Sequence, residues 1–589
     1  MKVSLVKPGA YLSESYRTDK AKEKANEARP TLTDTSPTLE EDANTLRIDS
    51  LKTHILIAPS VMNVDFNPRR SASGRCMRGD DVADVVVARA QRTRRALFML
   101  TVVLGGAIFW LAPHPPMIDL PQHAGQVAAL RDLVLGKSPW TELVRLNFFT
   151  PYLIGYGLAL PLSLVMPIAA ALKLLLTLGY WAFVAAGVLL RKRFKADERL
   201  DWLIVPAYFG FAYKWGFYTF LLAAPIGLLF ILLAKQYADA PGPRRALVLF
   251  ATGVLLFFSH ALVFLFACAV GTVLLVLRLR SWARRFVPVL LPYAGLAALC
   301  IVYGVVSLKA EAPITANEGV LHFGWDWKRA AKFFLYPLGS GEDPWAAPLT
   351  LFLLAVPWLL GLRIDAREPW RVAPFAVVVG IWLAVPSFGM KIAYLYERFA
   401  LFMLPCYVLM FRSAPAMQES GTRERRGRWV TVLTVLLCWG FLGVKAARTL
   451  RFADETRDFD EVAAAAQPGR LALMLVFDTV SSAANNRHVY VHYPVWYQAE
   501  QGGFVEFNFA WIQPQIVRYR LDRLPAVKPG SEWRPQKFDW NTYAAARYDY
   551  FFVRHTEPLK RDYFQNAQCA VTQVAAAGTW ALYERKGCR

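Results

Sequence analysis

Charged side chains are scarce in this sequence. Asp, Glu, Lys and Arg make up 19% of its 589 residues, whereas hydrophobic residues make up 55%. A soluble globular chain is typically about 25% charged and about 45–50% apolar. Both departures argue against a soluble cytosolic enzyme and against a disordered or fibrous chain. They favour one large membrane domain with flanking segments.

Several well-known motifs are missing as well. The sequence contains no P-loop, no G-x-G-x-x-G before a helix, no C-x-x-C pair and no H-E-x-x-H. ATP-driven transport, dinucleotide chemistry and a zinc-protease mechanism therefore have no support in the sequence.

The first 95 residues lack any apolar run of bilayer length. Residues 20–45 are polar and of mixed charge, which predicts a disordered or loosely helical segment. No apolar h-region follows the start, so this segment is not a signal peptide. We expect 1–95 to be a polar cytoplasmic segment, and a translation start inside it, for example at Met77, is left open.

Apolar blocks begin at residue 96 and continue to about 447. A transmembrane helix needs about 20 apolar residues, and the block 149–166 is expected at the interface or as a re-entrant segment. The pattern predicts a mainly α, polytopic membrane fold with about eleven crossings. These lie near 96–112, 167–190, 200–213, 216–235, 246–258, 260–277, 286–308, 347–362, 372–389, 392–411 and 429–446.

Basic residues outnumber acidic ones by 67 to 45, a net charge of +22. They gather between the apolar blocks, as membrane proteins do to fix their orientation, so nucleic acid is not an expected partner. Placing all the clusters in the cytoplasm puts loops 113–148 and 309–346, and everything after 447, outside. The clusters are 92–95, 191–195, 241–245, 278–285, 363–371 and 423–428.

Polar residues return after 447, and short strand-like runs appear. The runs are 471–477, 488–494, 549–554 and a pair of strands within 571–586, and 459–466 has a helical pattern. Residues 448–589 are therefore predicted to form a small extracytoplasmic α/β domain. Cys569 and Cys588 are its two cysteines, and either a disulfide or two reduced thiols fits the sequence.

The first outer loop contains the most informative polar pair, Asp119 and His123. Pro121 can begin a helix, which places Asp119 just before its N-terminus and His123 in its first turn. The carboxylate there can accept a proton, hold a metal or bind a sugar hydroxyl, and the histidine can act as donor, base or ligand. The alternative is that Asp119 merely caps the helix and His123 is an ordinary interfacial histidine.

This layout resembles the GT-C superfamily of membrane glycosyltransferases. The acidic residue after the first helix, the motif "DLPQH", the helical body and the C-terminal domain carry the resemblance, which extends over about 96–589. The resemblance implies that a sugar is transferred from a polyprenyl-phosphate-type donor to a glycan, lipid or protein acceptor of a bacterial envelope. The transfer would take place on the extracytoplasmic side of the inner membrane, and Asp119 would stand at the position of the family's catalytic acidic residue. Many members have two adjacent acidic residues here, whereas Leu120 follows Asp119, which leaves a divalent metal undecided.

Other polar side chains are expected on the same outer face. Cations there can hold a donor phosphate, with Arg398 preferred to Lys214 and then Lys391. The alternatives are an ion pair of Arg398 with Glu397 or another acid, headgroup contacts for the lysines, and a buried hydrogen-bonded role for His260. Trp325 in the second outer loop can stack on a sugar or anchor the loop.

The sequence thus predicts an integral membrane glycosyltransferase with Asp119 as base and His123 orienting a substrate. Arg398, Lys214, Lys391, His260, Glu397 and Trp325 are the predicted substrate-binding residues. A transporter or lipid flippase would use the same intramembrane charges, but such proteins often contain inverted repeats, and none is evident here. A non-catalytic component of polysaccharide assembly is a third possibility.

Overall fold

A computed structural model describes residues 79–279, 286–315, 321–365, 367–389, 392–412, 421–528 and 530–588. The chain divides into two units, residues 1–94 and 95–589, and the features discussed below belong to the second, except the beginning of a helix that starts at Gly79. Most of the predicted N-terminal segment, and Lys391, lie outside the described residues.

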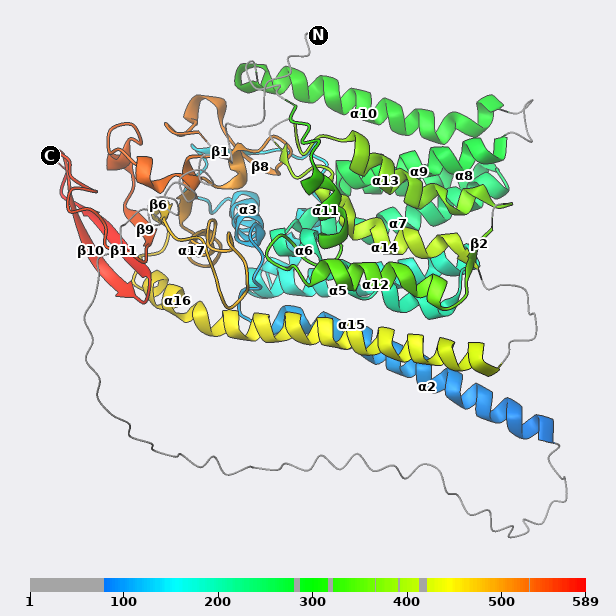
Figure 1. The fold of residues 1–589 in the computed structure, drawn as a ribbon. Coiled ribbons are helices and arrows are strands. Elements are labelled where there is room, and N and C mark those ends of the chain that lie inside the picture. The colour runs from blue at the N-terminus through cyan, green and yellow to red at the C-terminus, as the bar shows by residue number, and fades with distance from the viewer. Residues whose placement is uncertain are drawn as a thin grey trace, which may run out of the picture. The chain divides into compact units, whose positions relative to one another are not determined.

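The second unit is a mainly helical, polytopic membrane fold with a C-terminal sheet (Figure 1). Among the described residues, six helices are long and apolar enough to cross a bilayer. The corresponding helices are α2 (Gly79–Ala107), α5 (Ile168–Arg193), α7 (Tyr218–Asp239), α9 (Ala261–Leu279), α10 (Phe286–Thr315) and α15 (Gly421–Glu455). Shorter apolar helices accompany them: α4 (Leu153–Ser163), α8 (Pro243–Ser259), α12 (Ala346–Leu359) and α13 (Ala373–Ala384). The number of crossings, eleven, stays a prediction.

Two expected helical crossings are broken, and the sequence-based prediction of continuous helices there is wrong. Residues 198–215 form η2 (Glu198–Leu203), η3 (Pro206–Phe209) and α6 (Phe211–Trp215). Residues 392–411 contain η6 (Glu397–Phe399), α14 (Ala400–Tyr407) and η7 (Val408–Met410). Proline cannot donate a helical hydrogen bond, and Pro206 and Gly210 divide the first of these segments. Broken backbone at membrane depth is tolerated where other helices surround it.

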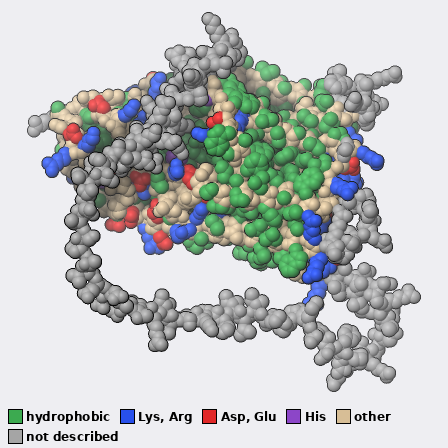
Figure 2. Space-filling view, in the orientation of Figure 1, with side chains coloured by type: hydrophobic (Ala, Val, Ile, Leu, Met, Phe, Trp, Pro, Cys, Tyr) green, Lys and Arg blue, Asp and Glu red, His purple; other side chains and the backbone are tan. Residues whose placement is uncertain are grey.

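Apolar side chains cover the helices on the face drawn in Figure 2, and Lys and Arg gather at the end remote from the sheet. Contacts between segments confirm this gathering. Asp239, at the end of α7, pairs with Arg193 from α5 and Arg278 from α9. Lys235 lies 4.0 Å from the ring centroid of Trp370. Three of the predicted basic clusters, 191–195, 278–285 and 363–371, therefore meet the end of α7 at one end of the bundle.

The C-terminal part forms a five-stranded sheet in the order β10-β11-β9-β6-β7. The central strand β6 (Leu471–Val476) runs parallel to β7 (Phe504–Glu506) and β9 (Tyr550–Arg554). The hairpin of β10 (Ala570–Ala577) and β11 (Trp580–Lys586) completes it, and the helix α16 (Arg457–Ala464) packs on the sheet through Phe459 and Trp580. These elements confirm the predicted strands 471–477 and 549–554, the hairpin and the helix.

Residues 488–494, however, are not a strand. They form turns that lead into the short helix α17 (Val495–Gln501). The parallel neighbours of β6 occupy both of its edges, so this segment cannot pair with β6. Its alternating apolar side chains are buried by three-dimensional packing instead, with Tyr490 and Tyr493 against Phe452 of α15.

The first outer loop is built into the C-terminal domain. Its helix α3 (Leu120–Val134) lies against α17, and its strand β1 (Val144–Leu146) pairs antiparallel with β8 (Val517–Tyr519). The other short elements are α11 (Trp327–Leu335), β2 (Arg363–Ile364), β3 (Phe388–Gly389), β4 (Ile392–Ala393), β5 (Phe411–Arg412), η1 (Ile108–Trp110), η5 (Pro369–Arg371) and η8–η12 between Phe509 and Arg547. The loop and the domain thus fold as one body.

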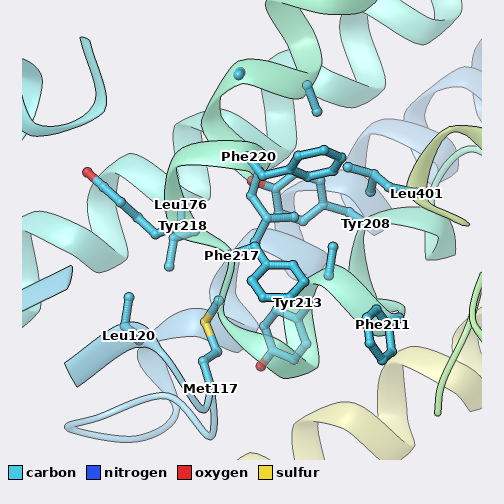
Figure 3. Close-up of a cluster of buried hydrophobic side chains, with 14 of the residues drawn as sticks. Met117, Leu120, Leu176, Tyr208, Phe211, Tyr213, Phe217, Tyr218, Phe220 and Leu401 are labelled. Atoms are coloured by element: carbon cyan, nitrogen blue, oxygen red, sulfur yellow. The ribbon is translucent and has the colours of Figure 1, made fainter. Parts of the chain in front are cut away.

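A cluster of aromatic side chains supports this loop from the membrane side. Figure 3 shows Met117 and Leu120 beside Tyr213 and Phe217, with Tyr208 and Phe220 behind them. All of these side chains are almost fully buried. Burial of large aromatic side chains stabilises a core strongly, so the segment 117–120 rests on a rigid base.

Candidate functional site

Asp119 lies at the junction of the loop and α3, and backbone pairing fixes its place. Ile118 N–H donates to the Lys214 carbonyl and Asp119 N–H to the Trp215 carbonyl, at 3.2 and 2.9 Å. Gly216 follows with φ of 76°, and a Cβ there would lie 3.0 Å from the Asp119 nitrogen. Only glycine satisfies both the left-handed backbone and this close approach.

The Asp119 carboxylate does not cap α3, which argues against the capping role considered from the sequence. Its side chain makes no capping hydrogen bond, and its backbone is helical rather than extended. The side chain is 13% exposed, and the Nε2 of His492 lies 3.6 Å from Asp119 Oδ1. Burial raises the pKa of the Asp119 carboxyl to about 7, and the positive charge of Arg398 acts in the opposite direction.

His123 faces the same region from the first turn of α3. Its Nδ1 lies 2.7 Å from the Tyr156 hydroxyl, which in turn donates to Gln515 Oε1. Burial, and to a lesser degree Arg398, lowers the pKa of His123 to about 3. The ring is therefore neutral and held by a hydrogen-bonded chain that ends in the C-terminal domain.

Polar side chains of α3 form hydrogen bonds with the C-terminal domain. The Gln122 amide contacts Phe507, Phe509 and His492, and Gln126 Oε1 accepts from Val517 N–H at 3.0 Å. The sequence analysis missed these residues. The spacing of Gln122 and Gln126, four residues apart on one helix, is a weak indication of a shared polar face. Nothing in the neighbouring sequence identifies His492 as a partner of Gln122.

Arg398 is the predicted cation that faces Asp119. Its Nε and Nη2 donate to the carbonyls of Tyr394 and Ala393, at 3.2 and 3.1 Å. Its guanidinium lies 3.6 Å from the ring centroid of Phe217. Among the residues that the structure describes, no carboxylate lies within ion-pair distance of Arg398, and its charge acts on Asp119 and His123.

The neighbouring Glu397 points to a different partner, as expected for adjacent residues. It is fully buried, and its Oε1 lies 3.2 Å from Lys332 Nζ of α11. Glu397 therefore belongs to an ion pair between η6 and α11, and the Glu397–Arg398 pair considered as an alternative does not form.

Lys214 lies behind the site rather than in it. Its Nζ contacts Ser340 Oγ at 2.6 Å, Glu342 Oε2 at 3.0 Å and the Asn485 carbonyl at 2.8 Å. Asp343 lies 3.6 Å away. The Lys214 ammonium is thus hydrogen-bonded to several groups. These bonds connect the backbone that pairs with residues 118–119 to the second outer loop.

The remaining predicted residues divide between the site and the surface. His260 is buried, accepts at Nδ1 from Leu262 N–H at 3.2 Å, and its Nε2 has no hydrogen-bond partner among the described residues. Its ring centroid lies 5.0 Å from that of Tyr152, and Arg398 and His123 are the titratable groups that act on it. Trp325 is 61% exposed, and its ring centroid lies 4.8 Å from Arg329 Cζ. It therefore lies on the surface rather than among the buried residues around Asp119.

Whether the chain can hold a metal ion depends on how many His, Cys, Asp or Glu side chains lie together. Within the described ranges, no group of three or more His, Cys, Asp or Glu side chains gathers that could hold a metal ion. Asp119 and His492 form a pair of such side chains, one fewer than the three protein ligands of a typical catalytic zinc site.

Comparison with known proteins gives a similarity to a solved structure. No protein-family model matches the chain, and no curated protein matches it by sequence. Among solved structures, the chain is similar to the arabinofuranosyltransferase AftD from Mycobacteria, with 13% sequence identity and a TM-score of 0.41. The similarity covers 84% of this chain, which spans 40% of the length of that protein.

Proposed function

We propose that this chain is a membrane glycosyltransferase that uses a polyprenyl-phosphate-type sugar donor on the extracytoplasmic face of a bacterial inner membrane. The observation that carries the proposal is the Asp119 carboxylate. It is mostly buried, accepts no hydrogen bond from the described residues and does not cap its helix. An ionisable side chain left unsatisfied beside a membrane domain is costly, and such groups mark functional sites.

The chemistry follows from the charges around it. Asp119 takes the proton from an acceptor hydroxyl, whose oxygen attacks the anomeric carbon of the donor sugar. The bond from that carbon to the phosphate oxygen breaks, and the phosphate leaves with the electron pair. Arg398 stabilises the leaving phosphate, while His123, neutral and hydrogen-bonded to Tyr156, orients a substrate.

The placement of the site supports an outer location. Asp119 is bonded to Trp215, just before α7, and the basic segments meet at the other end of α7. A helix of 22 residues is about 33 Å long, enough to cross the bilayer core. Cys569 and Cys588 form a disulfide in the sheet domain on the Asp119 side, which is typical of an oxidising compartment.

Replacement of Asp119 by Asn tests the proposal. We expect Asp119→Asn to lower sugar transfer by about 10²–10⁴-fold, because a positioned base is lost. Transfer is measured as release of polyprenyl phosphate from a panel of polyprenyl-phosphate pentoses and hexoses. Asp132→Asn is the matched control, because Asp132 lies on the same helix and pairs with Arg131. Normal transfer by a folded Asp119→Asn variant would refute the proposal.

A further inference from the structure

The Gln122 amide has a fixed orientation. Its Oε1 accepts from Phe509 N–H at 2.9 Å, and its Nε2 donates to the Phe507 carbonyl at 2.9 Å. A backbone N–H can only donate and a carbonyl can only accept, so a flipped amide would lose both bonds. The two backbone groups therefore determine that the NH2 group faces His492.

This orientation sets the tautomer of His492. Gln122 Nε2 lies 3.0 Å from His492 Nδ1, and an NH2 group there requires Nδ1 to be the acceptor. Burial lowers the pKa of His492 to about 3, so the ring is neutral, and its proton is on Nε2. That nitrogen lies 3.6 Å from Asp119 Oδ1.

We propose that His492 is a positioning residue of the transfer reaction, which presents an Nε2–H to the Asp119 carboxylate and holds it toward the acceptor hydroxyl. The inference rests on the proposed function and adds a residue of the C-terminal domain to the site. At 3.6 Å the contact is longer than a hydrogen bond. Catalytic hydrogen bonds are often long without substrate and shorten in the complex.

Among the described residues, His492 supplies the only Lys, Arg or His nitrogen within 4.0 Å of the Asp119 carboxylate, and that nitrogen carries the proton. Arg398 bonds to two carbonyls and stacks on Phe217, and the phenols near Asp119 come from α4 and from the segment before η6. The charged and titratable groups around Asp119 are Arg398, His123, His492, Tyr156 and Tyr394.

The pH profile of transfer distinguishes positioning from a structural role. Loss of the Nε2–H in His492→Leu should raise the pKa of Asp119 in the substrate complex, and the acid limb of kcat should move up by about one pH unit. His492→Gln, whose amide can donate from a similar point, should restore much of the wild-type profile. An equal loss of activity at every pH, with an unshifted acid limb, would overturn the proposal.

A second measurement does not depend on activity. Nitrogen-15 NMR of the full-length, histidine-labelled protein in detergent reports the tautomer, and His492→Gln identifies the signal. We expect a neutral Nε2–H ring in the wild type and a mixture of tautomers in Gln122→Met. An Nδ1–H or charged ring in the wild type would overturn the role of His492. If instead Asp119→Asn is active, the proposed function fails, whatever the tautomer.

Discussion

Arg398 and its neighbour Glu397 differ in the kind of partner that each has, and the partner decides the effect of substitution. Arg398 bonds to carbonyl oxygens, so its removal leaves no carboxylate unpaired. We expect Arg398→Ala to weaken donor binding about 10–100-fold, since hydrogen bonds to charged groups are worth about 1.5–3 kcal/mol. Tm should change little, because about 1 kcal/mol of cation–π contact with Phe217 is lost. Arg398→Lys should retain part of the affinity.

Lys332→Ala is the matched control for this variant. It leaves the buried Glu397 carboxylate without its cation, a loss on the order of 3 kcal/mol for a buried pair. Tm in detergent should therefore fall while donor affinity changes less. The assignment of phosphate binding to Arg398 would be wrong if donor affinity were normal in Arg398→Ala.

Ionisation of Asp119 predicts a pH dependence of both activity and stability. A base works in its deprotonated form, so kcat/KM should rise with pH through about 7, the pKa to which burial raises this carboxyl. Between its ordinary pKa and 7 the native state holds a proton that the unfolded state has lost, so stability falls as pH rises.

The measurement is the difference in Tm between the wild type and Asp119→Asn at pH 5 and pH 8. That difference cancels the contributions of His123 and His492, which both proteins retain. We expect the wild type to lose stability relative to the variant as pH increases. A constant difference would show that Asp119 has an ordinary pKa.

At the scale of elements, the contact of α3 with α17 holds the site together. A Cβ on Gly125 would lie 2.7 Å from Val495 Cγ1 and 3.1 Å from Gln498 Nε2. We therefore expect Gly125→Ala to cost about 1–3 kcal/mol, as overpacking of a core does, and to lower transfer by displacing α3. Gly157→Ala is the control, because nothing lies near a Cβ there and alanine favours helices. Equal Tm values for the two variants would contradict this packing.

For the molecule as a whole, the prediction concerns orientation. Reporters inserted after residue 195 should be cytoplasmic and reporters after residue 588 extracytoplasmic, because the basic segments meet at the end of α7 opposite Asp119. A fluorescent protein that folds in the cytoplasm and a phosphatase that needs export give complementary signals. Cys569 and Cys588 should react with maleimide only after reduction. The same compartment for both insertion points would exclude the topology.

Local patterns predicted those parts of the fold that depend on short segments. The strands β6 and β9 and the final hairpin followed from runs of alternating or apolar residues, and the long helices followed from bilayer-length apolar blocks. Asp119 followed from its position after the first crossing. None of these inferences needed to know which segments meet in space.

Residues that act through distant contacts could not be predicted. Lys214 looked available as a cation, yet Glu342 and Asp343, about 128 residues away along the chain, lie against it. His492 lies 370 residues from Gln122, and its own segment has the alternation of a strand. Only the packing of the loop into the C-terminal domain shows which polar side chains are paired.

The insertion of α3 into a domain made from the end of the chain also determines when the site is assembled. At about 5–20 residues per second, the ribosome needs roughly 20–75 seconds to add the 370 residues between Gln122 and His492. During that time α3 lacks its hydrogen-bond partners in the C-terminal domain. A chain released before residue 492 thus carries the six described membrane-length helices but lacks the contacts that hold α3, so the proposed site stays incomplete.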